Sequence, residues 1–154
     1  MKIIVTGATG HIGSYLIRDL GLQFKESEIV MIDNMMTQRF ASLFKLPEVG
    51  NYSFIEGDVR LMDLNSLFKG ADIVIHLAAI TDATGSFDKA TDVEENNYQS
   101  TLKVANASIE TGASLIALSS TSVYGTQNDI VDEDCSENEL QPQSPYASTK
   151  LKEE

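Results

Sequence analysis

The stretch MKIIVTGATGHIG, residues 1–13, decides the fold predicted for this chain. Residues 2–6 form an apolar, β-branched run, which is typical of a strand buried on both faces. Gly7, Gly10 and Gly13 follow, each separated from the next by two residues. In such a turn, backbone N–H groups can approach phosphate oxygens closely, and a following helix adds partial positive charge. The stretch therefore predicts a strand, a glycine turn and a helix. Two interpretations of the turn remain open at this point: it binds a pyrophosphate, or it is a glycine-rich connection without a ligand.

The helix after this turn has an apolar face made of Ile12, Tyr15, Leu16 and Leu20. A second apolar strand, residues 28–32, stops at Asp33, which lies 20 residues after Gly13. At this offset a carboxylate meets the ribose hydroxyls of a dinucleotide. A carboxylate there also repels a 2′-phosphate, so the pattern favours NAD over NADP.

Composition excludes several classes of protein. The 154 residues suffice for one domain with a sizeable core, and no apolar run is long enough for a membrane span. Met1 leads straight into the first strand, which leaves no room for a targeting peptide. The net charge of −12 argues against a nucleic-acid partner. Cys135 is the only cysteine, in an acidic loop expected to be exposed, which fits a reducing cytoplasm.

Strand and helix patterns alternate along the chain. We expect strands at 2–6, 28–32, 52–55, 72–77 and 113–119, helices at 35–46, 61–68 and 92–111, and loops at 80–92 and 126–143. This alternation predicts a parallel sheet covered on both faces, with right-handed crossovers. Ligands bind at the carboxyl ends of the strands in such sheets. The residues at these ends are Gly7, Asp33, Asp58, Ala78 and Ser120.

The last segment predicts a catalytic helix. Ser144 suits the N-cap and Pro145 the first helical position, and Tyr146 and Lys150 then share one helix face. A tyrosine with a pKa near 10 must lose about 3 units to act as a base near neutrality, roughly 4 kcal/mol. A lysine charge about 4.5 Å away contributes ~3.7 kcal/mol at an effective dielectric of about 20. Lys150 can supply most of this pKa shift, and Ser120 can hydrogen-bond the reacting oxygen. The alternative is that Tyr146 and Lys150 are a pair of surface residues without a catalytic role.

Seven motifs in order resemble the extended short-chain dehydrogenase/reductase family, in its NAD-dependent sugar epimerase/dehydratase branch. They are TGATGHIG at 6–13, Asp33-Asn34, GDVR at 57–60, HLAA at 76–79, Asn96-Asn97, SSTSVYG at 119–125 and PQSPYASTK at 142–150. The resemblance implies an α/β, Rossmann-type doubly wound parallel sheet. It also implies that residues 1–154 are the NAD-binding part of a longer enzyme whose substrate domain lies beyond them.

The resemblance also implies the site residues. The catalytic residues would be Ser120, Tyr146 and Lys150. The NAD-binding residues would be Gly7, Gly10, His11, Ile12, Gly13, Asp33, Asn34, Asp58, Val59, Leu77, Ala78, Ala79, Thr81, Asn96, Tyr146 and Lys150. His76, Asn97 and Tyr124 are expected to be structural, and Asp132, Glu133 and Asp134 to form a solvated loop. No metal is expected.

The reaction is narrowed by two residues. The family's dehydratases place Asp-Glu directly after the catalytic hydroxyl residue, where this chain has Thr121 and Ser122. Neither transfers a proton as a carboxyl group does, so water elimination is disfavoured. The leading hypothesis is a nucleotide-sugar 4-epimerase that transfers hydride transiently to tightly bound NAD. The alternatives are a sugar dehydrogenase or reductase, and a non-catalytic NAD-binding module.

The resemblance implies a nucleotide-sugar substrate, in the first place a UDP-sugar, and a cytoplasmic homodimer for the full-length enzyme. Family members continue for about another domain, whereas this sequence stops at Glu154, inside the active-site helix. We therefore expect the chain to be inactive alone and to expose an apolar sheet edge.

Overall fold

The computed structural model describes residues 1–81, 90–127 and 130–154. The chain divides into two compact units. The first comprises Met1–Ala79 and Ser100–Leu118, and the second Ile80–Gln99 and Ser119–Glu154. Most of the loop predicted at 80–92 falls outside the described residues.

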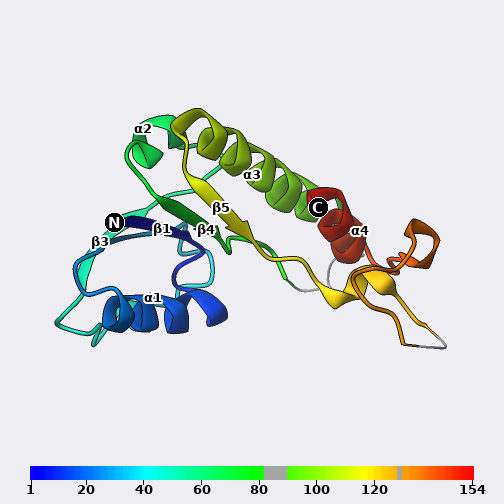
Figure 1. The fold of residues 1–154 in the computed structure, drawn as a ribbon, viewed down its shortest axis with the longest axis horizontal. Coiled ribbons are helices and arrows are strands. Elements are labelled where there is room, and N and C mark those ends of the chain that lie inside the picture. Colours follow the sequence, from blue (N-terminus) through cyan, green and yellow to red (C-terminus); the bar gives the residue numbers. More distant parts are fainter. Residues whose placement is uncertain (82–89, 128–129) are drawn as a thin grey trace. The chain divides into compact units, whose positions relative to one another are not determined.

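A five-stranded parallel sheet forms the first unit (Figure 1). Its strands are β1 (Lys2–Thr6), β2 (Glu28–Asp33), β3 (Asn51–Glu56), β4 (Ile73–His76) and β5 (Ser114–Ala117). The spatial order is β3-β2-β1-β4-β5, and every pair is parallel. The predicted doubly wound α/β sheet is confirmed, with all five strands within two residues of their expected positions.

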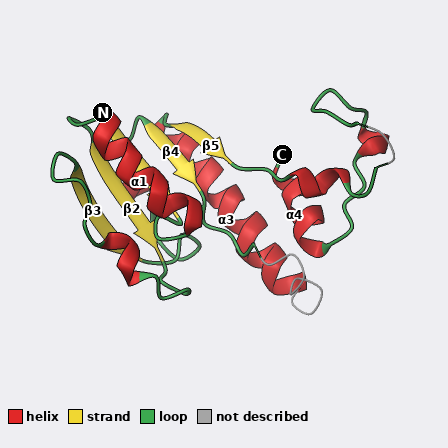
Figure 2. Ribbon diagram, turned by 90° about the horizontal axis from the view of Figure 1, so that it is seen from below, coloured by secondary structure: helices red, strands yellow, loops and turns green. Residues whose placement is uncertain are grey.

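Helices cover both faces of this sheet. The helix α1 (His11–Gln23) packs on one face of the sheet, the near face in Figure 2. On the other face lie α2 (Leu64–Phe68) and the later part of α3 (Ala90–Thr111) (Figure 1). Side chains of β1 alternate between the two layers, because Ile3 and Val5 join the α1 cluster while Ile4 joins the opposite one. The short strands are therefore apolar on both sides, as expected for a parallel sheet.

The buried face of α1 differs from the expected one. Ile12 and Tyr15 are 59% and 75% exposed. The residues that face the sheet are Gly13, Ile17, Leu20 and Gly21. A Cβ atom on Gly21 would lie 1.7 Å from the Tyr52 hydroxyl, so glycine is what lets the helix approach β3 this closely. Leu16 and Leu20 pack against the sheet as predicted, whereas Ile12 and Tyr15 do not, and the close approach at Gly21 was not predicted.

The helix predicted at 35–46 is wrong. Only one 3-10 turn forms there, η1 (Phe40–Leu43), and the aromatic side chains at its two ends are exposed. The Asp33 and Asn34 side chains each accept the backbone N–H two residues further on, which favours turns over a helix. Left-handed backbone then interrupts the segment at Met35, Gln38 and Lys45.

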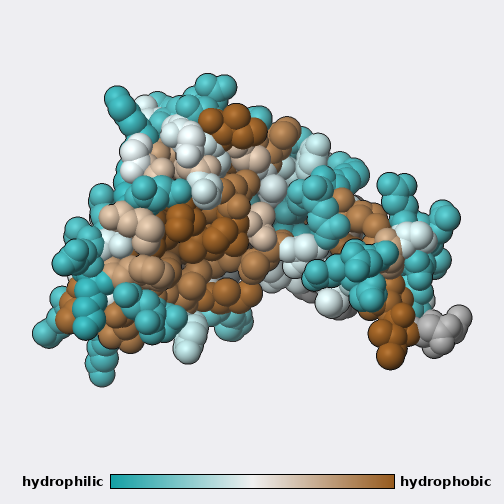
Figure 3. All heavy atoms as spheres, in the orientation of Figure 1, coloured by the Kyte–Doolittle hydropathy of each residue, from teal (hydrophilic) through white to brown (hydrophobic). Residues whose placement is uncertain are grey.

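Among the described strands, β5 pairs with β4 alone and so forms an edge of the sheet. Ile116 and Leu118 are 48% and 41% exposed along it. Figure 3 shows apolar side chains gathered on this side of the first unit. The expected apolar sheet edge is confirmed.

The second unit contains the start of α3, two 3-10 turns, η2 (Thr121–Tyr124) and η3 (Glu137–Glu139), and the helix α4 (Pro145–Glu153). Ser144 caps α4 as predicted, with its hydroxyl accepting the Ala147 N–H at 3.1 Å. Across the three described ranges, no helix combines the length and apolar character needed to cross a bilayer.

Candidate functional site

The glycine turn after β1 lies so close to neighbouring backbone that Gly7 and Gly13 leave no room for a Cβ atom. Gly7 has φ +66°, and a Cβ atom there would lie 2.6 Å from the Ala78 nitrogen. A Cβ atom on Gly13 would lie 2.3 Å from the Gly7 carbonyl oxygen. The Gly10 N–H closes the turn onto the same oxygen at 3.1 Å. The turn therefore brings β1, the end of β4 and the start of α1 into direct backbone contact.

The N-terminus of α1 is suited to an anion. Its N-cap, Gly10, has no side chain to accept a hydrogen bond, and no acid lies in the first turn. Intrahelical bonding begins at Ser14, which donates to the Gly10 carbonyl at 2.9 Å. The N–H groups of His11, Ile12 and Gly13 precede it and have no intrahelical acceptor. These groups and the helix dipole together favour phosphate oxygens.

Asp33 fixes a negative charge beside this turn. Its carboxylate accepts the Thr9 N–H at 3.0 Å and the Met35 N–H at 2.9 Å. It thus links the glycine turn to the end of β2. The adjacent Asn34 side chain contributes to the lowered pKa of Asp58, which follows β3.

The loop after β3 is also firmly anchored. The Arg60 guanidinium contacts the Asp58 carboxylate at 2.6 Å and lowers the pKa of that carboxyl group. Val59 is buried in the core. From α3, the Lys103 ammonium donates to the carbonyl oxygens of Arg60 and Met62, both at 2.7 Å. The loop assigned to adenine by the resemblance is therefore held by contacts from Arg60 within it and from Lys103 on α3.

The end of β4 completes this edge of the sheet. The Thr6 hydroxyl accepts the Leu77 and Ala78 N–H groups at 3.3 and 3.4 Å and lies 2.7 Å from His76 Nδ1. His76 is 5% exposed, as expected of a structural residue. Leu77, Ala78 and Ala79 are half-buried. The first unit therefore collects all its predicted cofactor residues at the carboxyl ends of four parallel strands.

In the second unit, Asn97 has the structural role expected of it, through backbone contacts that the sequence did not reveal. It is fully buried, its Oδ1 accepts the Ile80 N–H at 2.8 Å, and its Nδ2 donates to the Ile80 carbonyl at 2.9 Å. Asn96, the predicted supporting residue, acts through Asn97 by donating to the same Oδ1. The sequence holds one signal of this role: Asn97 lies four residues after the apolar Val93 and so shares its buried helix face. A buried amide requires hydrogen-bond partners. Thr81, next to Ile80, is exposed.

The predicted catalytic residues all lie in the second unit. Tyr146 is half-buried in the first turn of α4, and Lys150, one turn later, is 7% exposed. The Lys150 ammonium forms an ion pair with Glu153, with an Nζ–Oε2 distance of 2.8 Å. This acid was not anticipated as part of the site.

Ser120 lies at the start of η2, which packs against α4. Its hydroxyl is 2.8 Å from the Ser122 hydroxyl and accepts the Ser122 N–H at 3.3 Å. Ser120 is thereby fixed in orientation relative to the turn that follows it.

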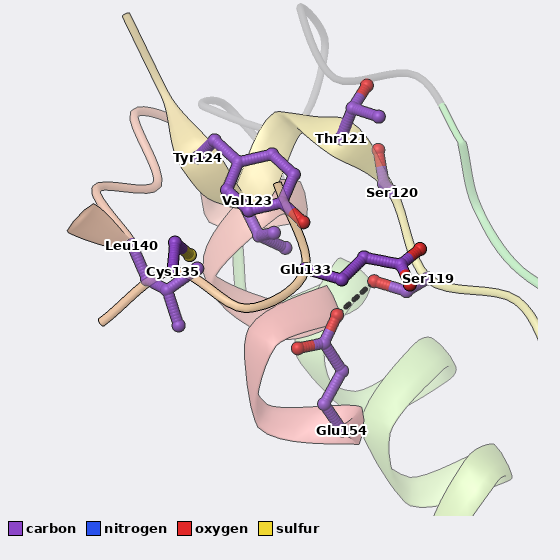
Figure 4. A pocket seen from close by; sticks show the side chains of 9 residues that line it. All are labelled: Ser119, Ser120, Thr121, Val123, Tyr124, Glu133, Cys135, Leu140 and Glu154. Atoms are coloured by element: carbon purple, nitrogen blue, oxygen red, sulfur yellow. Dashed lines mark hydrogen bonds between the residues drawn. The ribbon is translucent and has the colours of Figure 1, made fainter. Parts of the chain in front are cut away.

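An open hollow of about 580 Å³ adjoins Ser120 (Figure 4). It is lined by Ser119, Ser120, Thr121, Val123, Tyr124, Glu133, Cys135, Leu140 and Glu154. Burial, reinforced by Cys135 and Glu133, raises the pKa of Tyr124. Cys135 is half-buried in this wall, while its neighbours Asp132, Glu133 and Asp134 are exposed, as expected of a solvated loop. Within the described ranges, no cluster of potential metal ligands is found.

Comparison with known proteins identifies one family. The model of the NAD-dependent epimerase/dehydratase family matches residues 3–154. An uncharacterized UDP-glucose epimerase of Bacillus subtilis (strain 168), YtcB, is 36% identical over 98% of this chain and 49% of its own length. The dTDP-D-glucose 4,6-dehydratase of Mus musculus is 34% identical over 97% of this chain and 43% of its own length.

A solved structure gives the same result. A variant of the UDP-glucuronic acid 4-epimerase of Bacillus cereus, in complex with UDP-4-deoxy-4-fluoro-glucuronic acid and NAD, superposes with a TM-score of 0.89. It is 32% identical, and the match covers 99% of this chain and 50% of that one. The chain thus spans about half the length of the relatives it matches.

Proposed function

Because the chain belongs to the NAD-dependent epimerase/dehydratase family, we propose that it is the NAD-binding part of a nucleotide-sugar 4-epimerase. The observation that carries the step from family to epimerase is the pair Thr121 and Ser122 directly after Ser120. Hydroxyl groups occupy the two positions where the family's dehydratases have carboxyl groups. Water elimination needs a group that can give up a proton, and these hydroxyls are poor acids.

NAD is the cofactor, and the first unit has the features needed to hold it. The glycine turn and the N–H groups that begin α1 would bind the pyrophosphate. Asp33 would accept hydrogen bonds from the adenosine ribose, and the loop at Asp58 would lie along the adenine. Backbone donors matter in a chain with net charge −12, because they bind an anion without needing side-chain cations. When bound, NAD would supply the hydride acceptor and donor that the reaction needs.

The catalytic residues would move the proton. Tyr146 would take the proton of the sugar hydroxyl whose carbon loses the hydride, and would give it back after the sugar has turned over. Lys150 and the N-terminus of α4 favour the phenolate electrostatically. Ser120 would hydrogen-bond the reacting oxygen and keep it in line with Tyr146.

The substrate would be a UDP-hexose. The Bacillus subtilis relative, a UDP-glucose epimerase by name, and the Bacillus cereus 4-epimerase support this choice. We also propose that the full-length enzyme is a cytoplasmic homodimer, as the family resemblance implies.

The test uses the enzyme that contains this chain together with its substrate-binding half. Incubation with UDP-glucose should give its 4-epimer without net NADH, as followed by NMR of the sugar and absorbance of the cofactor. Tyr146→Phe should lower kcat by about 10²–10⁴-fold while NAD affinity changes little. The matched control, Tyr124→Phe, removes a phenol that the reaction does not use. Stoichiometric NADH, loss of water from the sugar, or full activity in Tyr146→Phe would each refute the proposal.

A further inference from the structure

The helix α4 takes part in two ion pairs that differ in their exposure to solvent. Lys150 and Glu153 lie one turn apart on α4, and only 9% and 6% of their side chains are exposed. Lys152 also pairs with an acid, Glu94 on α3, at 2.6 Å, but both of these side chains are about half exposed. A solvated pair of the second kind contributes little, because water and salt screen it. The buried pair is screened far less, so its charges act strongly on neighbouring groups.

The position of the buried pair matters because of its neighbour. Tyr146 and Lys150 are four residues apart and share a helix face, so the Lys150 ammonium can act on the Tyr146 phenol. Glu153 contacts that same ammonium at 2.8 Å. We propose that Glu153 is a positioning residue for the reaction: its carboxylate holds the Lys150 ammonium and offsets part of the positive charge that Lys150 presents to Tyr146. This inference rests on the proposed function, because it concerns how Tyr146 is made reactive.

The titratable groups that η2 and the neighbouring hollow bring toward α4 carry no positive charge that could act on Tyr146 in place of Lys150. The turn η2, which packs against α4, contributes the phenol of Tyr124. The hollow beside it is lined by Glu133, Cys135 and Glu154, which are acidic or neutral. From α3, Glu94 is paired with Lys152. Among the described residues of α4, Lys150 is thus the buried cation one helical turn from Tyr146, and Glu153 is the acid paired with it.

Removing the carboxylate should make Tyr146 easier to deprotonate. Since the carboxylate contacts the ammonium at 2.8 Å, it lies at most that much farther from the phenol than the ammonium does. At an effective dielectric of about 20, this predicts that Glu153→Gln lowers the titration midpoint of Tyr146 by about one to two pH units. The sign follows because the substitution removes a negative charge in contact with the ammonium.

The experiment is an NMR titration of the 154-residue chain labelled with ¹³C at tyrosine Cζ, with the Tyr146 signal assigned from Tyr146→Phe. Glu153→Gln should lower the Tyr146 midpoint by about one to two units, while Glu153→Asp, which keeps the charge, should leave it nearer to wild type. The matched control is Glu94→Gln, which removes the exposed ion pair between Glu94 on α3 and Lys152 on α4. It should move the Tyr146 midpoint by no more than about 0.2 pH units. An unchanged midpoint in Glu153→Gln, or an equal shift in Glu94→Gln, would overturn the proposal.

A measurement on the wild-type chain covers the case in which Glu153→Gln does not fold. A buried, ion-paired ammonium exchanges its protons slowly, so Lys150 should give a ¹⁵Nζ–H cross-peak near neutral pH that Lys150→Arg removes. Absence of this peak would also overturn the proposal. Failure of the proposed function is distinguishable, because it would appear as absent NAD binding or epimerisation while the Tyr146 titration still responded to Glu153.

Discussion

Substitution of Gly13 by alanine tests the glycine turn most sharply. The new Cβ atom would lie 2.3 Å from the Gly7 carbonyl oxygen and 2.8 Å from both Cα and O of Ala8. Ordinary contact begins near 3.4 Å, so the start of α1 must move away from the turn by roughly 1 Å (3.4 − 2.3 = 1.1). Overpacking of this kind costs about 1–3 kcal/mol of stability.

Cofactor binding should suffer as well. The same displacement pulls the first N–H groups of α1 out of reach of a pyrophosphate. Loss of even one hydrogen bond to a charged group, about 1.5–3 kcal/mol, lowers NAD affinity at least about tenfold. Urea unfolding followed by circular dichroism and calorimetric titration with NAD measure the two effects. Gly10→Ala is the control for stability, since its Cβ would lie 3.2 Å from its nearest neighbour, the Gly7 oxygen. Wild-type stability and NAD affinity in Gly13→Ala would refute this reasoning.

Three further predictions concern other parts of the site. The wild-type chain should bind NAD at least about tenfold more tightly than NADP, and Asp33→Asn should narrow the difference in calorimetry; comparable NADP binding by the wild type contradicts the role given to Asp33. Asn97→Asp should cost about 1–3 kcal/mol in urea unfolding, because a carboxylate cannot donate to the Ile80 carbonyl, whereas Asn96→Asp should cost less than half as much. The Arg60 contact lowers the pKa of Asp58 in the folded chain below its value of about 3.9 in the unfolded chain. The contact therefore stabilises the fold above about pH 3.9, and this stabilisation is lost as the pH falls through the pKa of Asp58 in the folded chain. Unfolding measured across pH should therefore show the deficit of Arg60→Gln shrinking from about pH 5 toward pH 2, and a constant deficit would contradict it.

The sequence predicted most of the sheet because its strands obey simple rules. Each is a short apolar run that ends in a residue of special geometry or charge, such as Gly7 after β1 or Asp33 in β2. The start of α4 was equally predictable, because Ser144 and Pro145 fit only the first positions of a helix. In these places local preference and tertiary packing favour the same structure.

The errors arise where tertiary contacts override a local pattern. Residues 35–46 carry apolar side chains at helical spacing, yet the side-chain hydrogen bonds of Asp33 and Asn34 produce turns instead. The contacts of Asn97 with Ile80 join segments that no spacing rule connects. Glu153 looks like a solvated acid in sequence, and only burial distinguishes it from the exposed Glu94.

The central claim is tested most directly by the fate of one hydrogen atom. The full-length enzyme should be given UDP-glucose carrying deuterium at C4, and the product should be analysed by NMR and mass spectrometry. The expected product is a 4-epimer of unchanged mass that keeps its deuterium at C4, formed without net NADH and about 10²–10⁴-fold more slowly by Tyr146→Phe. A product lighter by one water, deuterium lost to solvent, or NADH formed in proportion to product would contradict it.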